Sequence, residues 1–327
     1  MPELPEVEII ASELNRKLKN KIIKSVVVKA PKMVAIGPDV VSNTRIVKSY
    51  KVIKFIKLLK RQRILSVRRR AKLLIINLSP SATGGGPSPN HGEDKEVRAS
   101  LLLLVHLKMT GQFIYEDKKL RAKTRGYYRL INTLTAPKEL LPSKHTHVIF
   151  IFNDGSRLFF NDIRKFGYLK IVRDDEIGRV KDLSEFGPEP LDKKFTLKAF
   201  EFTVGKKPKG KIKQVLMDPK VVAGIGNIYS DEILFHAGVK PERKVASIKN
   251  QELREIYKNI KEVLSRAIKA KGSSVGDFVR TDGSWGQMGK LHFVYGRSGE
   301  KCKKCSSIIK SIKLNGRTGS YCPRCQK

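Results

Sequence analysis

The first half of the chain is dominated by short hydrophobic runs that predict β-strands. Between about residues 20 and 175, β-branched and aromatic residues gather in segments such as KSVVVKA, SLLLLVHL and HVIFIF, with turn-forming residues between them. The segment RIVKSYKVIKF at 45–55 is assigned to a strand as well. Because these strands follow one another without a helical period, we expect an antiparallel sandwich or barrel.

The pattern becomes helical between about residues 195 and 270, where apolar residues recur three and four positions apart. A separate amphipathic helix is predicted from Pro5 onward. Its first turn must lie near the core, which leaves residues 1–4 little freedom to fray. We therefore expect the N-terminus to have a role of its own.

Two segments interrupt the strands. Residues 79–99 are rich in Gly, Pro, Ser and charged residues, which predicts a disordered insertion between two strands. Residues 116–144 are basic and contain two prolines, which indicates a second surface loop.

The charge of the chain points to a polyanionic partner. It has 67 Lys and Arg residues against 31 Asp and Glu residues, for a formal net charge of +36. Such an excess attracts phosphate backbones, and its spread over every third of the chain favours nucleic acid. No apolar run approaches the roughly 20 residues of a membrane span, and MPELPEVEII does not resemble a secretory signal. We expect a cytoplasmic, nucleoid-associated protein without membrane contact.

All four cysteines lie near the C-terminus, as two CxxC pairs, Cys302/Cys305 and Cys322/Cys325. This spacing is typical of structural zinc sites, and four thiolates leave no open coordination position. We therefore predict one structural Zn²⁺ and no organic cofactor. A redox role would need an accessible pair with a lowered pKa.

The first residues offer a nucleophile. Removal of the initiator methionine would expose Pro2 as a secondary amine, and α-amino groups have a pKa of about 7.7–8.0. Such an amine can attack an aldehyde-like carbon and form an iminium, while Glu3 gives or takes the proton. Taken alone, however, Pro and Glu are also ordinary helix starters.

A glycine turn precedes a predicted helix at Gly224-Ile-Gly226-Asn227. Its backbone N–H groups could bind an anion, and the preceding basic stretch 206–213 favours phosphate. A tight turn between two helices is the alternative.

With these residues in hand, the chain resembles the formamidopyrimidine-DNA glycosylase family of base-excision repair enzymes, beginning with the opening MPELPEVE. The other matching motifs are RRAK ending at Lys72, HLKMTG from His106, HTHV from His145, DIRKFG from Asp162, FGPEP from Phe186, LMD ending at Asp218, GIGNIY around Asn227, VYGR ending at Arg297, and the four-cysteine finger.

The resemblance implies an α+β, multi-domain fold. Residues 1–190 would form a catalytic antiparallel β-sandwich with a leading helix, 191–290 a helix–two-turn–helix domain with a lesion lid, and 291–327 a zinc-finger β-hairpin. It further implies a monomer that flips oxidised purines (8-oxoguanine and formamidopyrimidines) out of double-stranded DNA, excises them, and cleaves the strand by β,δ-elimination.

The resemblance also implies roles for individual residues. Pro2 would attack C1′, Glu3 would act as the acid/base, Lys72 would assist β-elimination and Arg317 δ-elimination. The side chains that fill the void left by the flipped base would be Met109, Arg164 and Phe166. The DNA-binding residues would be His145, Arg164, Lys207, Lys209, Lys213 and Asn227.

The chain departs from the family pattern at a few positions. Lys108 stands where relatives usually have glycine, Lys165 replaces an arginine, and Pro208 takes a basic position flanked by the two lysines named above. The lid at 281–288 carries Trp285 and lacks the usual Gly-Tyr-Phe, which leaves the preferred lesion open.

Two alternatives stay open. One is an endonuclease VIII-like glycosylase for oxidised pyrimidines. The other is a non-catalytic zinc-finger DNA-binding protein, against which the complete set of Pro2, Glu3, Lys72 and Arg317 argues.

Overall fold

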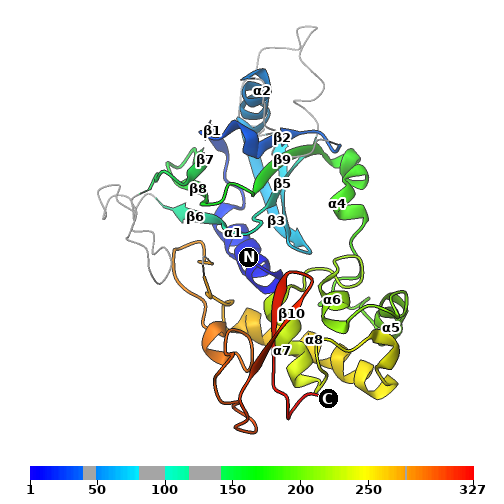
Figure 1. The fold of residues 1–327 in the computed structure, drawn as a ribbon. Coiled ribbons are helices and arrows are strands. Elements are labelled where there is room, and N and C mark those ends of the chain that lie inside the picture. Colours follow the sequence, from blue (N-terminus) through cyan, green and yellow to red (C-terminus); the bar gives the residue numbers. More distant parts are fainter. Residues whose placement is uncertain (40–48, 81–99, 118–140, 277) are drawn as a thin grey trace, which may run out of the picture.

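A computed structural model describes residues 1–39, 49–80, 100–117, 141–276 and 278–327. Its first part contains two packed β-sheets, and its second part contains helices and a small C-terminal hairpin, with the N-terminus between the two parts (Figure 1). No helix among these described residues is both long and apolar enough to cross a bilayer.

The two sheets confirm the predicted sandwich. One has the strand order β1-β7-β8-β6 and the other β2-β9-β5-β4-β3, and every neighbouring pair is antiparallel except β2 and β9. The strands are β1 (Ile23–Val28), β2 (Val34–Ile36), β3 (Gln62–Arg70), β4 (Leu73–Pro80), β5 (Leu101–His106), β6 (Gly111–Glu116), β7 (Thr146–Phe152), β8 (Arg157–Asp162) and β9 (Tyr168–Arg173).

Helix α1 (Leu4–Leu18) links the two parts of the molecule. Val7, Ile10 and Leu14 lie in the sandwich core, as the apolar spacing predicts. Leu4, by contrast, belongs to the core of the helical part. The first turn of α1 is therefore fixed from both sides.

The strand predicted at 45–55 is wrong over its described part, because residues from Ser49 onward form helix α2 (Ser49–Leu59). Phe55, Leu58 and Leu59 are buried, and their spacing of three and four positions places them on one helical face. Strand alternation would have turned lysines of this segment toward the core. Residues 45–48 lie outside the described part of the chain.

The predicted insertion at 79–99 is wrong for its first two residues. Ser79 and Pro80 still pair with Arg63 and Gln62 at the end of β4. Residues 81–99 lie outside the described residues, as does most of the second predicted loop, 118–140.

The helical prediction for residues 195–270 is confirmed, with a second hydrophobic core inside this region. Its helices are α5 (Leu197–Gly205), α6 (Ile212–Met217), α7 (Asn227–His236) and α8 (Asn250–Lys269), and the short α4 (Lys181–Ser184) precedes them. The 3₁₀ turns are η1 (Pro31–Met33), η3 (Asp174–Arg179), η4 (Val245–Ser247) and η5 (Met288–Leu291).

The chain ends in a hairpin of β10 (Lys310–Leu314) and β11 (Arg317–Tyr321). Asn315 and Gly316 form its two-residue turn with φ values of 45° and 74°. Asn-Gly is the preferred sequence for such a turn, because both central residues need a positive φ. Arg317 is thereby placed directly after the tip.

Candidate active site

The chain terminus is held inside the molecule. Pro2 is buried and Glu3 is 2% exposed, while Met1 keeps 40% of its surface. The backbone N–H of Leu4 donates to the carbonyl of Gly224 at 3.0 Å, which ties the start of α1 to the turn before α7. The prediction of a tethered N-terminus is confirmed.

The carboxylate of Glu3 is bound by the N-terminus of α7. It accepts hydrogen bonds from the backbone N–H groups of Gly226 (2.7 Å), Ile228 (2.8 Å) and Tyr229 (3.3 Å). Unpaired N–H groups and the helix dipole favour an anion at this position. The glycine turn binds an anion, as the sequence predicts, but the anion is the Glu3 carboxylate and not a phosphate.

Gly226 is required by this contact. A Cβ at this position would lie 2.4 Å from Cδ and 2.5 Å from Oε1 of Glu3. A residue without a side chain is therefore what lets the carboxylate reach the amides.

A second carboxyl group lies beside the first. Glu6 accepts the backbone N–H of Glu3 at 2.9 Å, the hydroxyl of Tyr229 at 2.5 Å and the N–H of Ser273 at 2.9 Å. Burial, together with the negative charge of Glu3, raises the pKa of Glu6. The pKa of Tyr229 is also raised, mainly by burial, so the phenol stays protonated and donates.

Lys72 approaches the same place from the sandwich. It lies in the turn between β3 and β4, where Ala71 has a φ of 52°. Its Nζ donates to the carbonyl of Ile225 at 3.0 Å, in the same peptide group as the Gly226 N–H that binds Glu3. Burial lowers the pKa of this lysine, partly offset by the charge of Glu3. The structure therefore brings Lys72 and Glu3 together, as predicted.

The three residues expected to fill the void in the duplex gather on two adjoining loops. Met109 and Phe166 are 38% and 46% exposed, so both side chains are accessible from outside the protein. The N–H of Arg164 donates to Thr110 Oγ1 at 3.0 Å, and its guanidinium lies 4.9 Å from the ring centre of Phe166. Asp162 supports both loops through its bonds to Thr110 and to the N–H of Gly167.

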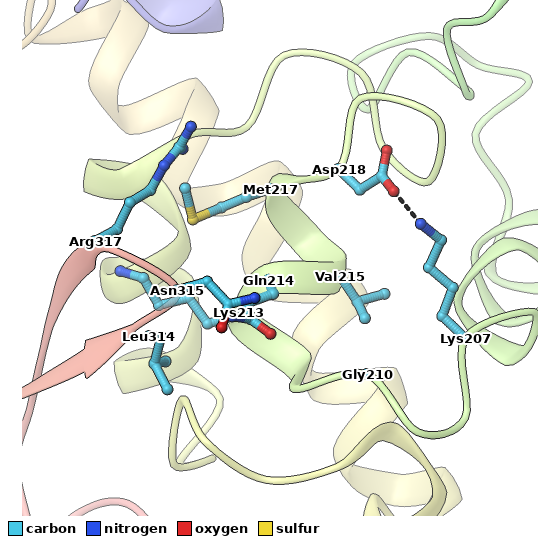
Figure 2. A pocket seen from close by; sticks show the side chains of 10 residues that line it. All are labelled: Lys207, Gly210, Lys213, Gln214, Val215, Met217, Asp218, Leu314, Asn315 and Arg317. Atoms are coloured by element: carbon cyan, nitrogen blue, oxygen red, sulfur yellow. Dashed lines mark hydrogen bonds and ion pairs between the residues drawn. The ribbon is translucent and has the colours of Figure 1, made fainter.

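Arg317 is exposed beside a cavity of about 390 Å³ between the hairpin and α6. Figure 2 shows Arg317 on one side of this cavity and the Lys207–Asp218 ion pair on the opposite side. Asn227 Nδ2 donates to the carbonyl of Thr318 at 3.0 Å, so that predicted DNA-binding side chain touches the hairpin next to Arg317.

The other predicted DNA-binding residues differ in accessibility. Lys207 and Lys209 are exposed and His145 is partly buried. Lys213 is different: its side chain is 1% exposed and forms an ion pair with Asp231. Its position is thus the interior beneath the hairpin.

The four cysteines converge as the CxxC spacing predicts. All four Sγ atoms lie within 4.8 Å of one another. The Cys302–Cys325 and Cys305–Cys322 Sγ distances are 3.9 and 3.4 Å. Tetrahedral Zn–S bonds of about 2.3 Å imply sulfur atoms about 3.8 Å apart. The residues present therefore fit one structural Zn²⁺.

Comparison with known proteins identifies the family. Residues 1–169 match the formamidopyrimidine-DNA glycosylase N-terminal domain, 186–279 match the H2TH domain of the same enzymes, and 299–327 match the zinc finger found in FPG and IleRS. The chain belongs to the formamidopyrimidine-DNA glycosylase family. Formamidopyrimidine-DNA glycosylases from Listeria monocytogenes and Carboxydothermus hydrogenoformans are 36% and 35% identical to it over 328 and 327 residues, with 100% of each chain covered.

Solved structures of the family superpose over the whole chain. Lactococcus lactis Fpg in complex with abasic-site DNA has a TM-score of 0.75 at 30% identity, and MutM in complex with carbocyclic 8-oxo-G DNA has 0.74 at 31%. Both alignments cover 100% of the two chains compared.

The structure also places His106 close to Lys72, and sequence reasoning gave this histidine no role. It is the last residue of β5, and its Nδ1 accepts the backbone N–H of Lys108 at 3.0 Å. Burial, with the positive charges of Lys108 and Lys72 nearby, lowers the pKa of His106 to about 3. The imidazole is therefore neutral near pH 7. The HLKMTG motif marked this position but did not indicate its charge state.

The base of the predicted lid is fastened to the sandwich part, a second feature that the sequence did not reveal. Glu13 of α1 accepts the N–H and hydroxyl of Thr281 at 3.1 and 2.7 Å, and the Nε of Arg280 at 2.7 Å. Lys17 and the backbone of Tyr115 bind Thr281 as well. These contacts join residues more than 160 positions apart, which no local pattern reports.

Proposed function

We propose that this protein excises oxidised purines from duplex DNA and then cleaves the strand at the resulting abasic site. The observation that carries the proposal is that Glu3 and Lys72 meet at the N-terminus of α7, with Pro2 buried directly before Glu3 in the chain. Family membership supports it, since solved relatives are complexes with abasic-site, Fapy-dG and 8-oxo-G DNA.

In the first step, the amine of Pro2 attacks C1′ of the damaged nucleotide. The C1′–N bond to the base breaks, and its electron pair leaves with the base, which takes up a proton. Glu3 takes up the proton that leaves the Pro2 nitrogen and gives it to O4′ as the sugar ring opens, leaving an iminium between Pro2 and C1′. The amides of α7 keep the Glu3 carboxylate in one position for this transfer.

In the second step, the strand is cut on both sides of the abasic sugar. Loss of a proton from C2′ expels the 3′ phosphate as the C3′–O bond breaks. Loss of a second proton then breaks the C5′–O bond and expels the 5′ phosphate. Lys72, whose pKa is lowered by burial, assists the first elimination, and Arg317 assists the second.

Access to the base requires its removal from the stack, which costs a few kcal/mol. Met109 and Phe166 supply apolar surface in its place, and Arg164 supplies a hydrogen-bonding cation for the orphaned partner base. This trio favours oxidised purines over the endonuclease VIII-like alternative.

The remaining parts bind the substrate. Zinc in the four-cysteine site would hold the hairpin that carries Arg317, and the exposed lysines would contact phosphates. We assign residues 1–190, 191–290 and 291–327 to catalytic, helix–two-turn–helix and zinc-finger domains, which the two separate cores support. We place the protein at the nucleoid, in keeping with its charge.

The proposal is tested with native-terminus protein and duplexes containing 8-oxoguanine, formamidopyrimidine, thymine glycol or an abasic site. Sodium borohydride should trap a covalent protein–DNA adduct and excision should be fastest for the purine lesions. The matched control is the same chain with an uncleaved N-terminal tag, which should form no adduct. Faster excision of thymine glycol would favour the pyrimidine enzyme, and binding without cleavage of any duplex would contradict catalysis.

A further inference from the structure

The zinc hairpin is attached to α7 through a buried ion pair. Asp231, on the second turn of α7, pairs through Oδ1 with Lys213 of α6, and its Oδ2 accepts the backbone N–H of Ser320 at 2.9 Å. The two charged side chains are 0% and 1% exposed. Buried charges cost several kcal/mol each unless they are paired and hydrogen-bonded. This pair therefore fixes β11 against the helix at one defined place.

The backbone of β11 packs closely against the ion pair. Lys213 Nζ also donates to the backbone carbonyl of Asn227 at 3.3 Å. The side-chain amide of Asn227 in turn donates to the carbonyl of Thr318 on the hairpin. A Cβ on Gly319 would lie 3.2 Å from Lys213 Cδ and 3.3 Å from Asp231 Oδ1. The strand from Thr318 to Ser320 thus packs on the pair, and Arg317 is the residue directly before Thr318.

The same helix holds Glu3 at its first turn and β11 at its second. The positions of Glu3 and Arg317 are therefore both set by α7. A shift of the hairpin on α7 would move Arg317 relative to the N-terminus while leaving Glu3 in place.

We propose that Asp231, acting through Lys213, is a positioning residue for Arg317. The inference rests on the proposed function and concerns its last step. The Asp231–Lys213 pair would support δ-elimination, whereas attack by Pro2 would not depend on this pair.

The test uses the zinc-loaded, native-terminus chain carrying Asp231→Asn. An asparagine can still accept the Ser320 N–H but cannot neutralise Lys213. On an abasic-site duplex, we expect the ratio of δ- to β-elimination products to fall about tenfold, since a 1 Å displacement of a catalytic group costs up to about 10²-fold. The rate of borohydride trapping should stay within about twofold of the parent chain, because Glu3 keeps its amides.

Two further variants make the test specific. Gly319→Ala leaves both charges in place and presses on them from β11, so it should lower the same ratio even if Asp231→Asn fails to fold. Glu300→Gln neutralises an exposed carboxylate of the same region, paired with Arg297 at 2.8 Å, and should change neither readout. Zinc content is measured for all variants.

The outcomes separate the two proposals. An unchanged product ratio in both Asp231→Asn and Gly319→Ala overturns the positioning role. A parallel loss of trapping and both eliminations, or loss of zinc, also overturns it, because the pair would then be merely structural. Absence of trapping by the parent chain contradicts the proposed function itself.

Discussion

Substitution of Gly226 by alanine would displace the carboxylate of Glu3 while leaving its charge unchanged. The backbone of Gly226, with φ −136° and ψ −152°, is extended and open to alanine. The substitution therefore adds no backbone strain, and its effect comes only from the contact between the new Cβ and Glu3. The new Cβ would lie 2.4 Å from Glu3 Cδ, so the carboxyl group must retreat by about 1 Å to restore an ordinary contact of 3.4 Å.

Both stability and rate should respond to this displacement. A hydrogen bond to a charged group contributes about 1.5–3 kcal/mol, so loss of one amide contact should destabilise the chain by about 2 kcal/mol. That corresponds to a fall in Tm of about 4–8 °C. A 1 Å misplacement of a catalytic group costs about 10²-fold in rate.

Single-turnover excision from an 8-oxoguanine duplex measures the effect, with thermal unfolding in parallel. Gly205→Ala is the matched control, because a Cβ there meets nothing within 4 Å, and it should behave like the parent chain. A Gly226→Ala variant with the parent rate would refute the assignment of Glu3 as the acid/base held by α7.

Three more predictions concern other parts of the site. Met109→Ala and Phe166→Ala should each slow excision from duplex DNA about tenfold or more, yet change stability by less than about 0.5 kcal/mol, because both residues lie at the surface. An unchanged excision rate would contradict their void-filling role. Chelation should release one Zn²⁺ per chain, expose four titratable thiols and suppress δ-elimination. Full δ-elimination by the chelated chain would show that the zinc finger is not needed for this step. His106 has a folded-state pKa of about 3 against about 6.5 unfolded, so the unfolded state binds the extra proton between these values and stability falls as pH drops through that window. Urea unfolding should show about 2 kcal/mol lost between pH 7.5 and pH 5, and His106→Asn should abolish this part of the decline. An equal decline in the variant would contradict the neutral, partly buried imidazole.

The sequence predicted those features that depend on local pattern. Short β-branched runs indicated the sandwich, apolar spacing indicated α1 and the helical part, and the two CxxC pairs indicated the metal site. Helix α2 was missed because its lysine-rich segment also contains β-branched residues, and its buried face is evident only from the spacing of Phe55, Leu58 and Leu59.

Interactions between distant residues could not be predicted in the same way. Glu3 binds amides 223 to 226 positions away, and Glu13 holds the lid from 267 and 268 positions away. Lys213 looked like one more phosphate-binding lysine of a basic stretch, but the acid that pairs with it lies on the next helix. A side chain's partner depends on tertiary packing, which composition and spacing do not report.

The identity of the trapped amine tests the account most directly. Protein isolated from cells would be reduced with borohydride on an abasic-site duplex, digested, and analysed by peptide mass spectrometry. The account predicts that the sugar remnant is on the nitrogen of Pro2 in a chain without Met1. An adduct on Lys72, or strand cleavage by a chain that retains Met1, would contradict it.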